Sequence, residues 1–167
     1  MKKTLALILT ILVAVLITGC QGNDKLKADF LKYESAPDKA TVLKDFEKYS
    51  PELSIGEYDD EDEENYKIKN YTFDDTPGTL WLTFSKSNSV MKKIVFVTQL
   101  SDTDTAEKWM ESLNDQFGFY KIKHPYEERV GATYYWYKDT DKEIMLDYAQ
   151  SEANKETIYT EISEVFK

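Results

Sequence analysis

Cysteine is almost absent from this sequence, because Cys20 is the only one in 167 residues. No internal disulfide can form, so a fold has to rest on an apolar core. Histidine is equally scarce, with His124 alone, which excludes a zinc site built on two histidines. Gly-rich phosphate loops and Gly-x-Ser-x-Gly elbows are also missing. These absences argue against an enzyme and against a bound cofactor or metal.

A hydrophobic run long enough to span a bilayer is missing too. Residues 5–17 contain one polar side chain, Thr10, and fall short of the roughly 20 residues that a span needs. Lys2 and Lys3 precede the run, and this order is typical of a signal peptide. The run ends in LITGC at residues 16–20, which resembles a bacterial lipobox. That resemblance implies cleavage before Cys20 and a lipid on its sulfur, so that acyl chains anchor the protein to the membrane.

The lipobox interpretation divides the N-terminal region into two segments and predicts that the protein lies outside the cytoplasm. Residues 1–19 are predicted to be a lipoprotein signal peptide. Residues 20–37 are predicted to be the lipidated cysteine, a tether and a short helix. The remaining chain then faces the extracytoplasmic side of the cell membrane.

Negative charge dominates the chain, with a formal net charge of −10 that becomes −12 once Lys2 and Lys3 are removed. Such a domain is repelled by nucleic acid, so DNA and RNA are excluded as partners. Acidic side chains crowd residues 57–64, but their spacing does not match a calcium-binding loop, which favours a solvated loop. Aromatic residues make up 14% of the chain, including 12 tyrosines, so a folded domain is expected.

Two segments carry apolar residues at helical spacing. The first is predicted to begin at residues 35–38, with Pro37 tolerated in the first turn. The second is predicted to begin near residues 102–104, whose side-chain oxygens can cap backbone N–H groups, and to stop at Gly118. The apolar positions are Val42, Phe46, Tyr49 and Leu53 in the first helix, and Ala106, Met110, Leu113 and Phe117 in the second. Each helix is followed by three predicted strands, at residues 67–73, 79–84 and 92–100, and at 132–138, 143–149 and 157–162. Residues 75–78 are predicted to form the first hairpin turn.

The two halves match when the chain is shifted so that Val42 falls on Ala106. Tyr71 then falls on Tyr135, and Leu82 on Leu146, without a gap. The predicted fold is therefore α+β, a tandem α-β-β-β repeat at residues 38–101 and 102–167. Its antiparallel sheet has helices packed on one face. Two unrelated α+β segments would share part of this alternation, and that alternative stays open.

The second half also carries motifs of a known group. Phe117-Gly118 ends the helix, and the sequence GATYYWY follows at residues 131–137. This arrangement resembles the β-lactamase-inhibitor-protein-like fold, shared with small envelope lipoproteins of the outer-membrane-assembly type. Members of that group mainly bind proteins through the sheet, so the resemblance implies a protein-binding role.

Strand alternation predicts where a partner would bind. The shift places Tyr71, Phe73 and the leucines of the second strand on one face, together with Tyr135 and Tyr137, under the helices. The opposite face would then carry the predicted partner-binding residues Trp81, Tyr134, Trp136, Met145 and Tyr159. Aromatic side chains dominate protein interfaces. In the alternative, the N-terminal segment with Phe30 and Tyr33 buries this face.

Together these patterns predict a lipid-anchored envelope protein that grips a protein partner, as inhibitor, immunity factor or assembly aid. The alternative is a lipoprotein that binds a small ligand, with the aromatic face stacking on a sugar or peptide. That alternative needs a cleft between the two halves.

Overall fold

The computed structural model describes residues 28–54, 61–139 and 141–167. The predicted signal peptide, Cys20 and most of the tether lie outside the described residues, as do residues 57–60 of the acidic segment. Within the described part of the chain, no helix is long and apolar enough to cross a membrane.

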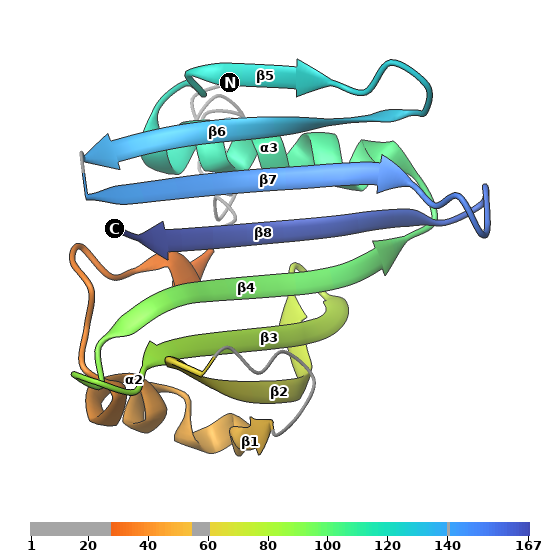
Figure 1. Cartoon of the computed structure of the whole chain (residues 1–167). Coiled ribbons are helices and arrows are strands. Elements are labelled where there is room, and N and C mark those ends of the chain that lie inside the picture. Colours follow the sequence, from red (N-terminus) through yellow and green to blue (C-terminus); the bar gives the residue numbers. More distant parts are fainter. Residues whose placement is uncertain (1–27, 55–60, 140) are drawn as a thin grey trace, which may run out of the picture.

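Eight strands form one antiparallel sheet (Figure 1), in the order β1-β2-β3-β4-β8-β7-β6-β5. The strands are β1 (Glu52–Ser54), β2 (Glu63–Phe73), β3 (Thr76–Ser85), β4 (Met91–Leu100), β5 (Ile122–Pro125), β6 (Gly131–Asp139), β7 (Lys142–Gln150) and β8 (Ile158–Phe166). The α+β class and the antiparallel sheet predicted from the sequence are confirmed. The short edge strands β1 and β5 were not predicted.

The two halves of the chain meet at the middle of the sheet. Strands β1–β4 come from the first half and β5–β8 from the second, and β4 pairs with β8 along their whole length, for example Phe96 with Ile162. The last strand of each half is therefore central, and the first strand of each half is an edge. Any site at the β4–β8 junction draws residues from both halves.

The helices begin where the sequence indicates. The side chain of Asp38 accepts a hydrogen bond from the Thr41 amide at the start of α2 (Lys39–Asp45), at 3.0 Å. Asp102 does the same for Thr105 at α3 (Thr103–Phe117), at 3.1 Å. Two short 3₁₀ helices, η1 (Asp29–Leu31) and η2 (Glu47–Tyr49), complete the set. The first helix is shorter than predicted, and Leu53 lies on β1 instead.

The first hairpin reverses at Asp74 and Asp75, not at residues 75–78. Both residues have positive φ, 49° and 57°, as a two-residue hairpin turn with the twist of the strands requires. Pro77 and Gly78 therefore lie within β3. Gly78 is needed there because a Cβ would come within 2.6 Å of the Phe96 ring and of the Val97 carbonyl oxygen.

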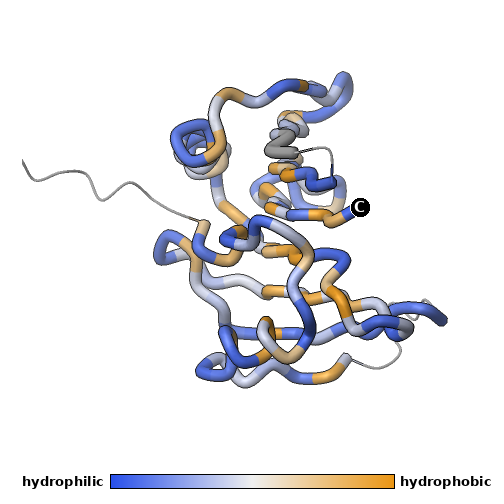
Figure 2. Tube along the Cα trace, turned by 90° about the vertical axis from the view of Figure 1, so that its left-hand side faces the viewer, coloured by the Kyte–Doolittle hydropathy of each residue, from blue (hydrophilic) through white to orange (hydrophobic). Residues whose placement is uncertain are grey.

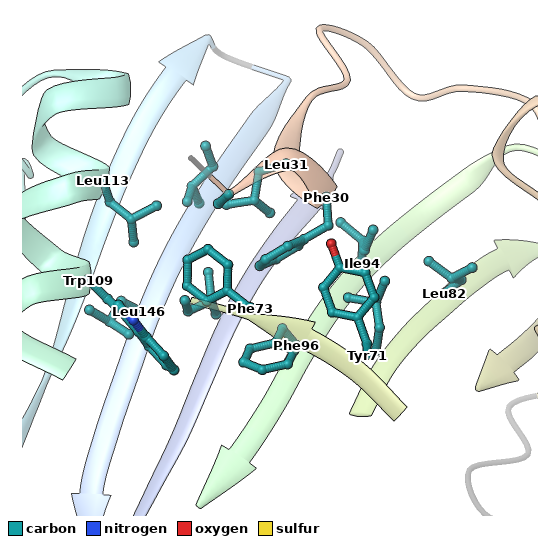
Figure 3. Packing of buried hydrophobic residues seen from close by; sticks show 14 of the residues in the cluster. Phe30, Leu31, Tyr71, Phe73, Leu82, Ile94, Phe96, Trp109, Leu113 and Leu146 are labelled. Carbon is teal, nitrogen blue, oxygen red and sulfur yellow. The ribbon is translucent and has the colours of Figure 1, made fainter. Parts of the chain in front are cut away.

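The core fills the space between the helices and one face of the sheet, called here the covered face. Figure 2 views the molecule after a quarter turn, and α3 lies to one side of the strands. The N-terminal segment belongs to this core: Phe30 is fully buried with its ring centroid 5.5 Å from that of Phe73 and 5.9 Å from those of Tyr71 and Phe96 (Figure 3). Residues predicted as tether and short helix thus enter the middle of the fold.

Candidate functional site

The other face of the sheet, called here the open face, carries an apolar row across both halves. Strand pairing aligns its members side by side. Because residues that pair directly share a face, their side chains are neighbours. The row runs from β2 to β5 through Lys67, Trp81, Val95, Ser163, Met145, Tyr135 and Ile122.

Trp81 and Tyr159 meet at a concavity in this face, of about 460 Å³. Its lining comes from β2, β3, β4 and β8, and so from both halves of the chain: Glu63, Asn65, Lys67, Thr79, Trp81, Thr83, Lys93, Val95, Val97, Tyr159 and Glu161. Trp81 is partly exposed and Tyr159 is 42% exposed, so both rings remain accessible. A concave surface with an apolar floor and a few polar groups is typical of a binding site.

Charged side chains border the floor and are arranged in pairs. The Lys67 ammonium lies 4.5 Å from the centroid of the Trp81 ring, a cation–π contact that holds the indole in place. Lys93 and Glu161 form an ion pair at 3.5 Å. Thr83 donates a hydrogen bond to Asn65 Oδ1 at 2.7 Å. The floor is therefore apolar and its rim is close to neutral, in contrast to the acidic chain as a whole.

The half of the open face on β6 and β7 is more polar. Asp147 Oδ1 accepts hydrogen bonds of 2.7 Å from both Tyr126 and Thr133. The guanidinium of Arg129 lies 4.2 Å from the centroid of the Tyr126 ring. These contacts fix the Asp147 carboxylate beside the apolar row, where it would favour a donor or a cation on a partner.

Tyr134 and Trp136 are not on the open face, and their predicted placement is wrong. They pair with Leu146 and Ile144 on the covered face and are 3% and 1% exposed. Of the five predicted binding residues, the structure brings Trp81, Met145 and Tyr159 to the open face. Neither Tyr134 nor Trp136 can contact a partner without unfolding of the domain.

A β-bulge explains this error. In β2 the register shifts between Ile68 and Tyr71, so one extra residue inverts the alternation of faces before Tyr71. In β6 the shift comes after Trp136, beyond the aromatic run. Aligning the two halves by sequence matched Tyr71 to Tyr135 across these different bulge positions, so Tyr134, Tyr135 and Trp136 were each assigned to the wrong face.

The misplaced aromatics instead build a core under α3. Asn114 accepts a 3.0 Å hydrogen bond from the Trp136 indole and another of 3.0 Å from the Tyr120 amide. Tyr134 stacks on Tyr148 with centroids 6.2 Å apart, and burial together with Tyr134 raises the pKa of the Tyr148 hydroxyl well above its usual value. This cluster stabilises the second half and leaves no accessible ring.

Tyr135 and Ile122 are open-face residues that the sequence comparison missed. Tyr135 was assigned to the covered face, but it pairs with Met145 and is partly exposed. Ile122 belongs to the unpredicted strand β5 and is 38% exposed. Correct placement of the β6 bulge would have been enough to identify Tyr135.

Groups of three or more metal-ligating side chains are absent from the described part of the chain. Among the described residues, Lys142 and Glu164 form a deeply buried ion pair that faces the core, and the Lys142 ammonium also donates to the carbonyl of Tyr33. It ties the N-terminal segment to β7 and β8.

No protein-family model, curated protein sequence or solved structure matches this chain. The similarity of the second half to the β-lactamase-inhibitor-protein-like group therefore stays a prediction, and any function has to be inferred from the open face of the sheet.

Proposed function

We propose that this chain is a membrane-anchored extracytoplasmic lipoprotein that binds a protein partner through the open face of its sheet. Trp81, Met145 and Tyr159 are the proposed contact residues, with Tyr135 added. The role is that of an inhibitor, an immunity factor or an aid to envelope assembly. The anchor is a lipid on Cys20, as the lipobox at residues 16–20 implies.

The single observation that carries the proposal is the uncovered apolar row. A sheet with one face on the core normally places polar residues on the other. Here Trp81 on β3 and Val95 on β4 are direct neighbours, and Met145 on β7 continues the row beyond the small Ser163 of β8. Contiguous apolar surface rimmed by polar groups is typical of a protein interface, and tryptophan and tyrosine dominate its binding energy.

The partner is a protein rather than nucleic acid because of charge. The chain has a net charge of −10 and the rim of the concavity is balanced, so a polyanion finds no attraction. A partner whose binding surface is apolar and carries little net charge, or a small positive one, can pack on the open face without leaving an unpaired charge. We propose no catalytic activity.

The test is capture of envelope proteins on an immobilised mature chain that carries Cys20→Ser. Trp81→Ala/Tyr159→Ala removes two accessible rings of the open face. Leu53→Ala is the matched control, because Leu53 is also apolar and 50% exposed but lies on the covered side of β1. The expected result is one specific protein retained by the unchanged chain and by the control, and lost by the double variant.

Circular dichroism and thermal melting of all three proteins show whether each is folded. Retention by the folded double variant would contradict the open-face site. Absence of any specific protein on the unchanged chain would contradict the protein-partner role.

The concavity beside Trp81 favours a second candidate, a small ligand such as a sugar or peptide. Its lining comes from both halves, as the alternative function requires, and its volume of about 460 Å³ lies within the usual range for small-molecule sites. A ligand stacked on Trp81 would change the tryptophan fluorescence, and Trp81→Phe would remove that change. Fluorescence titration with sugars and short peptides therefore separates the two candidates.

We also propose that the fold arose as a tandem repeat. Three features support it: each half runs from a helix to four strands, the strand order is mirrored about β4 and β8, and the β2–β3 and β6–β7 hairpins each contain a register shift of the same kind. The unit is then α-β-β-β-β rather than α-β-β-β. The two halves do not align without a gap, since the first hairpin closes with the pair Phe73 and Thr76 and the second with the pair Asp139 and Lys142.

A further inference from the structure

The loop between α3 and β5 exposes a phenylalanine. Phe119 is 82% exposed, the highest value for a large apolar side chain among the described residues. A single exposed apolar residue is common on protein surfaces and by itself indicates nothing. Three further observations at this loop and beside it indicate that Phe119 has a specific role.

The loop presents Phe119 in a fixed position. Gly118, with φ of 83°, ends α3 in a conformation that other residues rarely adopt. The next residue, Tyr120, turns inward: its ring packs on Tyr134 at 4.8 Å, and its amide donates to Asn114 Oδ1 at 3.0 Å. Because Tyr120 is held on both counts, the neighbouring Phe119 is directed outward.

Positive charge accompanies the exposed ring. Lys121 and Lys123 follow Phe119 and are both exposed, and residues 116–126 contain no acidic side chain although the chain is acidic overall. Contact with the Tyr134 hydroxyl raises the pKa of the Lys123 ammonium, which therefore remains charged at neutral pH. An aromatic ring beside lysines is the combination found at the interface between lipid and water.

The tether enters the fold at the same place. The Ala28 amide donates to Gln116 Oε1 at 3.1 Å, so the first described residue lies beside the end of α3. Eight residues separate Ala28 from Cys20, a reach of at most about 28 Å. A lipid on Cys20 therefore keeps the C-terminal end of α3 within this distance of the membrane.

We infer that the tip formed by Phe119, Lys121 and Lys123 contacts the membrane that holds the lipid anchor. Phe119 enters the interfacial region and Lys121 lies against anionic headgroups. This inference rests on the proposed lipidation of Cys20.

The orientation has a consequence for the partner. Ala28, which belongs to the core cluster, and α3 both lie on the covered side of the sheet (Figure 1 shows α3), so the open face is turned away from the bilayer. Trp81 and Tyr159 then face outward, where a partner in the surrounding space reaches them without crossing the lipid surface.

The test uses the lipidated full-length protein in vesicles of equal parts phosphatidylglycerol and phosphatidylcholine. Phe119→Cys receives an environment-sensitive fluorophore, because Cys20 is blocked by its lipid. Leu53→Cys on β1 and Tyr159→Cys on the open face are the matched controls. The expected result is a blue shift in emission, with quenching by spin-labelled lipid, for the label at position 119 only. Lys121→Glu should reduce that quenching in anionic vesicles but not in pure phosphatidylcholine.

Each other outcome has a defined meaning. Flotation of the protein with the vesicles, combined with an unshifted label at position 119, overturns the membrane contact and leaves the anchor intact. Failure to float overturns the anchor and, with it, the contact. A blue shift that occurs without vesicles indicates self-association and also overturns the proposal.

Discussion

The buried ion pair between Lys142 and Glu164 yields the most demanding prediction. Their side chains are 1% and 0% exposed, and Lys142 also donates to the Tyr33 carbonyl. Lys142→Met keeps the length of the side chain but leaves the Glu164 carboxylate without its cation. Loss of one partner from a buried pair costs about 3–5 kcal/mol, because an uncompensated charge remains in the core.

The expected loss in free energy of unfolding is large for a domain of this size. A domain of roughly 150 residues changes its melting temperature by about 2–4 °C for each kcal/mol, so Lys142→Met should lower it by roughly 10 °C or more. Urea denaturation followed by circular dichroism gives the free energy of unfolding directly. Lys142→Met/Glu164→Leu should recover most of the loss, because replacement of both charges by apolar groups is often neutral or stabilising.

An exposed pair serves as the control. Lys69 and Glu52 lie 2.7 Å apart with side chains 60% and 62% exposed, so water screens them. Lys69→Met should leave the free energy of unfolding nearly unchanged. The reasoning is refuted if Lys142→Met behaves like Lys69→Met, or if the double variant is no more stable than Lys142→Met alone.

Two further predictions follow from burial. Trp136→Ala should lower the free energy of unfolding by about 3–5 kcal/mol, because it removes a ring that is 1% exposed and takes one hydrogen-bond donor away from Asn114. Trp81→Ala on the open face should lower the free energy of unfolding much less. Equal losses in urea denaturation would contradict the assignment of faces. Burial raises the pKa of Tyr71 to about 12, above the roughly 10 of an unfolded tyrosine, so the folded state holds its proton more tightly. The resulting stabilisation is complete below pH 10 and is lost as the pH rises towards 12. Tyr71→Phe should flatten part of this decline in denaturation midpoints measured between pH 9 and 12, and an unchanged slope would contradict the shift.

The open face shows how far strand alternation carries a prediction. Trp81, Met145 and Tyr159 lie on strands whose alternation is regular around them, so their face followed from counting residues. Tyr134 and Trp136 were assigned by comparison with β2, where a bulge inverts the alternation. A bulge depends on how two strands pair, and no local residue pattern in β2 marks it.

Local chemistry determined several features from the sequence alone. Asp102 caps α3 because its carboxylate accepts a backbone N–H group within the same turn, and Gly118 ends α3 because glycine adopts positive φ readily. The signals for these features lie within a few residues of one another. The α+β class followed in the same way, from periodicities that change along the chain.

Tertiary structure alone decided what joins distant parts of the chain. Phe30 belongs to the core only because β2 and β4 bring Tyr71, Phe73 and Phe96 to one place, so a segment predicted as tether became a central element. Trp109 was left out of the predicted apolar stripe of α3, yet it is completely buried against Phe73. Which apolar side chains are covered depends on how the layers pack, and short-range sequence patterns do not contain that information.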